Sequence, residues 1–234
     1  MITQEMILTL ESRKPMKKTA IILGASGLTG NLLLNQLIAD ERYDSIVIFN
    51  RKSIGQTHPK VTEFIGEILR LNQFKKEFTG HEVYCCIGTT AKKTPDRSMY
   101  RNIDFGIPVA AAQLCAKNKI DTFLVISSMG ANPGSNLFYN KTKGEMEQAV
   151  LSKKIPNTYI LRPSFIGGNR NENRPGEKIG MAIAKLIQPL LVGKLRKYRL
   201  IEADKIARAM VHLANSKPNS QVFTSDKIEA LGSG

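Results

Sequence analysis

The segment Gly24-Ala25-Ser26-Gly27-Leu28-Thr29-Gly30 constrains the fold of this 234-residue chain more than any other feature. An apolar run at residues 19–23 comes directly before it and predicts a buried strand. Apolar residues at helical spacing follow it and predict a helix, namely Leu28, Leu32, Leu33, Leu37 and Ile38. A strand joined to a helix by a short glycine-rich turn is typical of the first βαβ unit of a parallel sheet.

The three glycines of this loop have separate functions in a dinucleotide site. Gly24 allows the tight turn after the strand, Gly27 lets a pyrophosphate approach the backbone, and Gly30 lets the helix pack closely on the sheet. The start of the helix offers unpaired N–H groups and a positive dipole end to phosphate. The alternative is a turn that is merely rich in glycine. The predicted cofactor contacts in this loop are Gly24, Ser26, Gly27, Leu28, Thr29 and Gly30.

Strands and helices alternate along the rest of the chain. Further strands are predicted near 45–49, 61–65, 82–87, 122–126 and 159–161, with helices near 69–78, 104–117 and 140–152. This alternation predicts an α/β fold, a Rossmann-type doubly wound parallel sheet with helices on both faces. At the start of the second of these helices, Asp104 is expected to interact favourably with the helix dipole.

The regular alternation of predicted strands and helices ends after Pro163. A polar loop at 167–178, a helix near 179–187, a basic stretch at 194–199, a helix near 204–215 and a strand near 222–224 are expected. We therefore predict a single domain over 16–234, with 164–203 as its substrate-side loop and helix. Residues 1–15 form an arm whose place in the fold the sequence leaves open.

The end of the second predicted strand indicates which dinucleotide binds. An acid at this point would accept a hydrogen bond from the ribose 2′-OH of NAD, but the chain has Asn50-Arg51-Lys52 there. The guanidinium of Arg51 can bind phosphate oxygens with two N–H groups, and Lys52 adds a second positive charge. NADP(H) is therefore favoured, NAD(H) stays possible, and a solvated basic turn is the alternative reading.

Four residues in the middle of the chain predict acid/base chemistry. Ser127 and Ser128 follow the predicted strand at 122–126, at the sheet edge where α/β proteins bind ligands. Tyr139 and Lys143 are four residues apart and so share one face of a helix. An ammonium beside a phenol favours the phenolate, which makes Tyr139 a usable general acid/base. A surface tyrosine with a chance lysine partner is the alternative.

These motifs together resemble the short-chain dehydrogenase/reductases. The extended and atypical branches of that superfamily share the GxxGxxG pattern at residues 24–30, a strand-end serine and the YxxxK pair. The atypical Tat-interacting oxidoreductase group and bacterial NAD(P)-binding relatives are the most similar. They have similar residues at positions 127–131 and 143–145. They also have a similar Leu161-Arg162-Pro163 segment followed by residues like those at 173–177. The resemblance extends over nearly the whole chain from about residue 17.

The resemblance implies a reaction and further contacts. Tyr139 would exchange a proton with a substrate oxygen while a hydride passes to or from the cofactor, and Lys143 would hold the cofactor ribose. Ser128 would bind the substrate oxygen, with Ser127 as the alternative. Further cofactor contacts would come from Glu67, Ile68, Cys86, Ile87, Gly88, Thr89, Pro163, Ser164 and Ile166.

The formal net charge of +14 favours an anionic ligand. Residues 151–208 hold 13 Lys+Arg against 4 Asp+Glu, so the excess concentrates on the predicted substrate side. This field would attract an anionic cofactor and substrate, first of all through Arg162, Arg170 and Arg174, although a solvated basic face is the alternative. Nucleic-acid binding ranks last, because no nucleic-acid module is evident and aromatic residues are only 6%.

Composition and residue spacing argue against several other classes of protein. Three cysteines without CxxC spacing and three scattered histidines predict no metal site and no disulfide framework. Vicinal Cys85 and Cys86 lie on a predicted strand and are expected in the core. The N-terminus lacks the pattern of a secretory signal and no apolar run is long enough to span a membrane, so a cytoplasmic protein is expected.

The sequence thus predicts an NADP(H)-dependent oxidoreductase that acts on a small carbonyl or alcohol, and its charge favours an anionic one. An epimerase-like or dehydratase-like enzyme of nucleotide sugars is one alternative. A non-catalytic NADP(H) sensor or protein-interaction module is another. The sequence does not identify the substrate, a protein partner or the oligomeric state.

Overall fold

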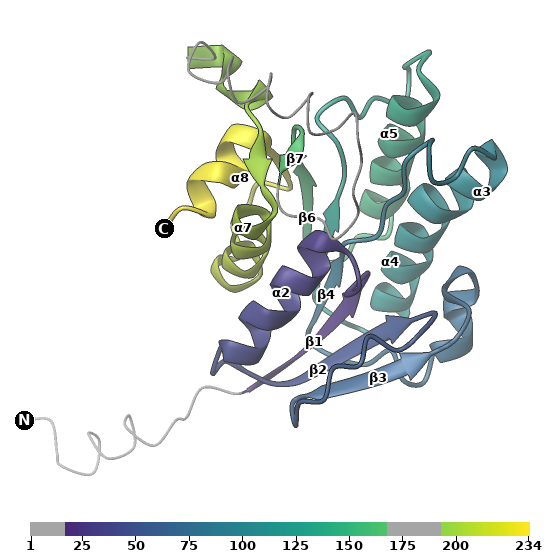
Figure 1. Cartoon of the computed structure of the whole chain (residues 1–234), viewed down its shortest axis with the longest axis vertical. Coiled ribbons are helices and arrows are strands. Elements are labelled where there is room, and N and C mark those ends of the chain that lie inside the picture. The colour runs from purple at the N-terminus through teal and green to yellow at the C-terminus, as the bar shows by residue number, and fades with distance from the viewer. Residues whose placement is uncertain (1–16, 168–192) are drawn as a thin grey trace, which may run out of the picture.

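The computed structural model describes residues 17–167 and 193–234 and contains a seven-stranded parallel sheet (Figure 1). The strands follow the order β3, β2, β1, β4, β5, β6, β9. Their bounds are Val61–Ile65, Tyr43–Asn50, Lys18–Leu23, Glu82–Cys85, Thr122–Ile126, Asn157–Arg162 and Val222–Thr224 in that order. The chain reverses its direction of travel across the sheet between β1 and β4. This is the doubly wound Rossmann arrangement, so the predicted fold class is confirmed.

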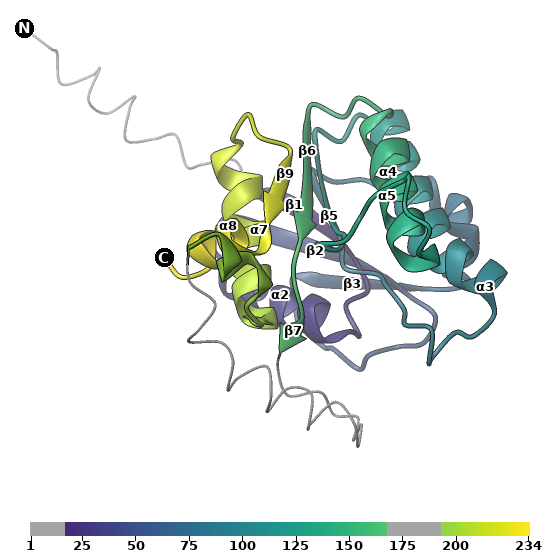
Figure 2. The same cartoon turned by 90° about the horizontal axis from the view of Figure 1, so that it is seen from above.

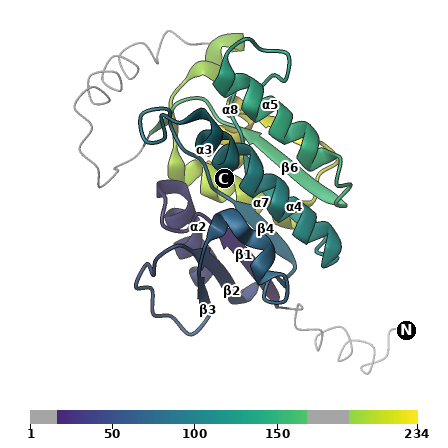
Figure 3. The same cartoon turned by 90° about the vertical axis from the view of Figure 1, so that its right-hand side faces the viewer.

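Helices cover both faces of the sheet, as the view from above shows (Figure 2). On one face lie α2 (Leu28–Ala39), α7 (Ala203–Ser216) and α8 (Ser225–Leu231). The other face carries η1 (Ile68–Phe74), α3 (Arg97–Arg101), η2 (Asn102–Gly106), α4 (Ile107–Lys117) and α5 (Phe138–Leu151) (Figure 3). Both faces of the central strands are therefore buried, which explains their continuous apolar sequences.

Each face has its own hydrophobic core. Ile22 of β1 points into the core beneath α2 and α7, where Leu37 and Met210 pack. Ile21 points into the opposite core, which Leu114 of α4 and Met146 of α5 complete. Successive strand residues point to opposite faces, so a single apolar strand supplies both cores.

The helix predicted at 104–117 is longer and less regular in the structure. It is one continuous helical run over 97–117, in which η2 is a π-turn between α3 and α4. Pro108 explains the turn, since its ring would clash with the carbonyl of residue 104 in a regular helix. The N–H of Ile107 donates to the carbonyl of Asn102 instead, which adds one residue to that turn.

Other boundaries also differ from the prediction. The helix expected near 69–78 is the short 3₁₀ helix η1, and β4 ends at Cys85, two residues earlier than expected. The basic stretch near 194–199 lies in a 3₁₀ helix, η4 (Gly193–Tyr198), except for Arg199, which follows it. Two short strands, β7 (Ile166–Gly167) and β8 (Ile201–Glu202), pair in parallel and were not predicted, and neither were α3 and α8. The arm at 1–15 and the helix near 179–187 lie outside the described residues.

A buried polar network lies on the side of the sheet where the strands begin. Glu82 of β4 accepts hydrogen bonds from Tyr43 at 2.6 Å and Tyr84 at 2.7 Å, and pairs with Lys18 at 2.7 Å. Asn215 of α7 accepts a hydrogen bond from Lys18 and donates one to the hydroxyl of Tyr43. The network therefore ties three strands and the penultimate helix together, far from the carboxyl edge where ligands bind.

Candidate active site

The glycine loop has the geometry that a phosphate-binding turn needs. Gly24 has a φ of +87°, which favours glycine, and a Cβ there would come within 3.1 Å of the Cys86 backbone. A Cβ on Gly30 would lie 2.1 Å from the carbonyl oxygen of Gly24, so α2 approaches the loop as closely as a glycine allows. No side chain of the described residues caps α2, which leaves its first N–H groups available to an anion. The loop thus fits a dinucleotide phosphate.

The turn after β2 is organised by a carboxylate that the sequence analysis missed. Glu63 of β3 accepts hydrogen bonds from the Asn50 amide at 2.9 Å, from the Ser53 hydroxyl and from the Ile54 N–H at 3.1 Å. Burial raises the pKa of Glu63, but these three bonds lower it more, so its pKa lies below the usual value. Asn50 is therefore buried and engaged with Glu63.

The two cations of this turn remain on the surface. Arg51 and Lys52 are exposed, and neither has a carboxylate partner in the described part of the chain. Glu63 holds this turn in place through its hydrogen bonds. Both positive charges therefore face solvent at the carboxyl edge of β2. No local sequence pattern marks Glu63, because its three partners lie 9 to 13 positions away.

Lys143 lies at the centre of the predicted catalytic cluster. Its ammonium is 2.8 Å from Asp104 Oδ1, and the side chains of the two residues are only 4% and 1% exposed. It also donates to the carbonyl of Ile126 at the end of β5, at 3.4 Å. The other oxygen of Asp104 accepts the N–H of Thr89 at 2.8 Å. Lys143 is thus fixed between β5, the loop after β4 and the π-turn of η2.

Asp104 keeps Lys143 charged. Burial lowers the pKa of Lys143, but the charges of Asp104 and of Tyr139 raise it more, so the net pKa is above the usual value. Asp104 was expected to act on a helix N-terminus, and the structure instead places it inside the helical run, facing Lys143. One sequence feature could have indicated the contact with Lys143: Asp104 is the only acidic residue between residues 97 and 120.

The two candidate serines have different surroundings. The hydroxyl of Ser127 donates to Glu147 Oε1, and both residues are buried. Glu147 is also paired with Arg162, whose Nε lies 2.9 Å from Oε1. Ser128 is half-buried, and its hydroxyl has no partner within 17–167 and 193–234. Of the two strand-end serines, Ser128 is therefore the one whose hydroxyl is not engaged by the described residues.

Arg162 does not serve the anionic field that the charge distribution suggested. Its guanidinium binds both oxygens of Glu147, so its charge is already neutralised inside the fold. Arg170 and Arg174 lie outside the described residues. Within the described part of the chain, any attraction of an anion would therefore come from cations other than Arg162.

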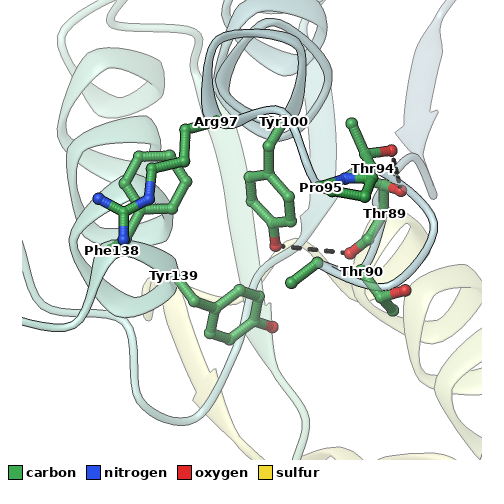
Figure 4. A pocket seen from close by; sticks show the side chains of 9 residues that line it. Thr89, Thr90, Thr94, Pro95, Arg97, Tyr100, Phe138 and Tyr139 are labelled. Atoms are coloured by element: carbon green, nitrogen blue, oxygen red, sulfur yellow. Dashed lines mark hydrogen bonds between the residues drawn. The ribbon is translucent and has the colours of Figure 1, made fainter.

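Tyr139 lines a cavity of about 440 Å³ (Figure 4). The Tyr139 side chain is 42% exposed, and the ring of Tyr100 packs edge-on against it with centroids 6.4 Å apart. Tyr100 also packs against Phe138 and donates its hydroxyl to the Thr89 carbonyl at 3.4 Å. The cavity is lined by Thr89, Thr90, Ala91, Thr94, Pro95, Arg97, Tyr100, Phe138 and Tyr139. The predicted acid/base residue thus faces a space that can hold a small molecule.

The remaining predicted contacts follow the carboxyl edge. Glu67 is exposed and Ile68 buried directly after β3, while Cys86, Ile87, Gly88 and Thr89 continue from β4 toward Asp104. A Cβ on Gly88 would lie 3.5 Å from Asp104 Oδ1. Beyond β6, Pro163 is buried, Ser164 donates to the Arg199 carbonyl, and Ile166 pairs with Ile201.

The cysteines belong to the core in this structure. Burial raises the pKa of the Cys85 thiol to about 11, and the Cys86 sulfur lies 3.9 Å from the Met210 sulfur. Neither is a reactive thiolate. In the residues that the structure describes, no group of histidine, cysteine and carboxylate side chains could hold a metal ion. Over the same residues, no helix has the length and apolar character of a membrane span.

Comparison with known proteins adds a family and a fold. A family model described as NAD(P)H-binding matches residues 24–217. Protein HTATIP2 of Rattus norvegicus is 30% identical over 182 residues, which cover 76% of this chain and 75% of that protein. The protein FMP52, mitochondrial, of Debaryomyces hansenii is 28% identical over 212 residues, which cover 87% and 90%.

Two solved structures share the fold. The enzyme WbmH of Bordetella bronchiseptica in complex with NAD+ superimposes with a TM-score of 0.68 at 17% identity, over 93% of this chain and 80% of that one. A UDP-glucose 4-epimerase of Thermotoga maritima gives a TM-score of 0.67 at 16% identity, over 92% and 81%. Both carry the Rossmann architecture described above.

Proposed function

Because the chain belongs to the NAD(P)H-binding family, in the atypical branch of the short-chain dehydrogenase/reductases, we propose that it is an NADP(H)-dependent oxidoreductase. Its substrate would be a small carbonyl compound or the corresponding alcohol. The observation that carries this proposal is the buried Lys143–Asp104 pair beside Tyr139, which faces a cavity. A purely structural tyrosine would not need a buried charge beneath it.

Three residues perform the chemistry in this proposal, namely Tyr139, Ser128 and Lys143, and Asp104 positions one of them. When bound, the nicotinamide cofactor supplies or accepts the hydride. The hydroxyl of Tyr139 exchanges a proton with the substrate oxygen, and Ser128 donates a hydrogen bond to that oxygen. Lys143 lies on the same helix face as Tyr139 and places a positive charge beside it, and Asp104 keeps that buried charge in place.

The preference for NADP(H) rests on the turn after β2. Arg51 and Lys52 are exposed there, and Glu63, the carboxylate that contacts this turn, is occupied by three hydrogen bonds. A 2′-phosphate at this turn would therefore meet two cations. The exposed cations support NADP(H) over NAD(H).

Replacement of Tyr139 by Phe tests the mechanism. The change removes the hydroxyl and keeps the ring, so NADPH-dependent reduction of small aldehydes and ketones should fall about 100-fold or more. NADPH binding, followed by the fluorescence of the bound cofactor, should be retained. Tyr159→Phe is the matched control, because Tyr159 is buried in β6 and its hydroxyl has no partner in the described residues.

The outcome separates the candidate functions. Turnover that persists unchanged in Tyr139→Phe would contradict the proposed mechanism. NADPH affinity without turnover of any small carbonyl compound would instead indicate a non-catalytic binding module. The cytoplasmic location stays a prediction, since the FMP52 relatives carry the word mitochondrial in their names; cell fractionation would decide it.

A further inference from the structure

One cation lies at the edge of the cavity that Tyr139 faces. Arg97 is the first residue of α3, and its guanidinium carbon lies 5.3 Å from the ring centroid of Phe138. Its side chain is exposed, and it has no carboxylate partner in the parts of the chain that the structure describes. Arg101, one turn further on, is by contrast paired with Glu145. Arg97 thus has a positive charge that the fold itself does not use.

The position of Arg97 is fixed by packing. Its guanidinium stacks on Phe138, and Phe138 is held in turn by the edge of Tyr100, with centroids 5.6 Å apart. A guanidinium that rests on an aromatic ring keeps its N–H edges free, and those edges match the two oxygens of a carboxylate. The arginine is therefore pre-organised to bind an oxyanion, which reduces the entropy lost on binding.

The other lining groups are neutral. Figure 4 shows Arg97 and Phe138 on one side of the cavity and the threonines on the other, with Tyr139 extending from the first side toward Thr90. The rings of Tyr100 and Phe138, with Ala91 and Pro95, supply apolar surface. Among the nine lining residues, Arg97 is the one that carries a charge. Such a cavity suits a ligand with an apolar, planar body and one negative charge.

The charges around the cavity also favour a negatively charged ligand. Lys92, which is exposed, lies on the same loop after β4. The nearest acid in sequence, Asp96, accepts the N–H of Met99 at 2.6 Å and caps α3. The local balance therefore stays positive.

We propose that Arg97 anchors a carboxylate, so that the substrate of the reaction proposed above is a planar, apolar carbonyl compound, or its alcohol, with a single carboxylate. This inference rests on the proposed function for the carbonyl, but the anion site stands on its own geometry. A single guanidinium neutralises one charge. A phosphate dianion would bring two charges to a lining that offers one cation, which disfavours it.

A binding experiment tests the anion site without any turnover. Protein saturated with NADP+ is titrated with 2-naphthoate and with its neutral isostere 2-naphthamide, and both dissociation constants are measured by saturation-transfer NMR. A charge-assisted bidentate contact should make the naphthoate bind about 10- to 100-fold more tightly than the amide. Arg97→Gln should bring this ratio close to one, and Arg97→Lys should keep part of it.

The matched control is Lys117→Gln. It removes one positive charge at the other end of the same helical run, in the last turn of α4, and should leave the ratio as in the unmodified protein. Equal affinity for both probes, a ratio that survives Arg97→Gln, or no binding of the naphthoate would each overturn the inference. A fall of the ratio in Lys117→Gln as large as in Arg97→Gln would also overturn it, because the effect would then be one of net charge.

A turnover experiment separates this inference from the proposed function. The probes are 6-formyl-2-naphthoate and its methyl ester, reduced with NADPH. The aldehyde carbon accepts the hydride of NADPH and its oxygen accepts the proton of Tyr139, which yields the alcohol and NADP+. The acid should show the higher kcat/KM, and Arg97→Gln should remove that preference. Tight naphthoate binding without any turnover would support the anion site and refute the oxidoreductase. Turnover with equal kcat/KM for acid and ester would support the oxidoreductase and refute the anion site.

Discussion

Asp104→Asn is the most informative single change in this molecule, because it removes a buried charge and keeps the shape. Asparagine can still accept the N–H of Thr89, whereas Lys143 loses the carboxylate that lies 2.8 Å from its ammonium. Both side chains are almost completely buried. Removal of one partner from a buried ion pair costs about 3–5 kcal/mol of stability, since the other charge is left uncompensated.

The pH dependence gives the sharper test. In the unmodified protein the pKa of Lys143 is raised above its usual 10.5, so the stabilisation from the pair is fully present below pH 10.5 and is lost as the pH rises through the folded-state pKa. In Asp104→Asn, burial without a partner lowers the pKa of Lys143 below the unfolded value. The free energy of unfolding of the variant should therefore increase with pH, relative to the unmodified protein, over the range from about pH 7 to about pH 10.

Urea unfolding followed by circular dichroism measures both effects. The double variant Asp104→Asn, Lys143→Met replaces the pair by neutral groups and should regain much of the stability lost in the single variant. A single variant that stays within about 1 kcal/mol of the unmodified protein, with the same pH dependence, would refute the view that Lys143 is charged and buried against Asp104.

Three further changes address the cofactor and the core. Arg51→Ala should weaken NADPH binding by about tenfold or more and NADH binding far less, and equal losses in a titration of both would contradict the assignment of the 2′-phosphate site. Gly30→Ala would place a Cβ 2.1 Å from the Gly24 carbonyl, so both the melting temperature and NADPH affinity should fall; normal affinity would show that the loop can adjust. Tyr84→Phe removes a hydroxyl that binds Glu82 at 2.7 Å, and urea unfolding should show a loss of about 1–2 kcal/mol with turnover unchanged.

The sequence predicted the strands and helices that a local pattern of residues marks. Apolar runs identified the strands of the large sheet, because strands buried on both faces are apolar throughout, and the glycine loop identified its first crossover. The pairs that organise the site were not predictable in this way. Periodicity tells which face of a helix is buried, but it does not tell that Asp104 meets Lys143 or that Glu63 meets Asn50, since both contacts depend on the three-dimensional arrangement of distant segments.

The π-turn shows why the site was hard to read. The sequence predicts a regular helix near 104–117, and Pro108 is the local sign against that regularity.

The same turn makes the length of this helix a functional constraint. Successive residues of a helix are rotated by about 100° around its axis, so one residue more or less before Asp104 would swing its carboxylate away from Lys143. Substitutions on the exposed side of 97–117 leave that angle unchanged, whereas a single insertion or deletion between Arg101 and Ile107 does not. The electrostatics of the candidate active site therefore depend on how many residues the helix contains as much as on which residues they are.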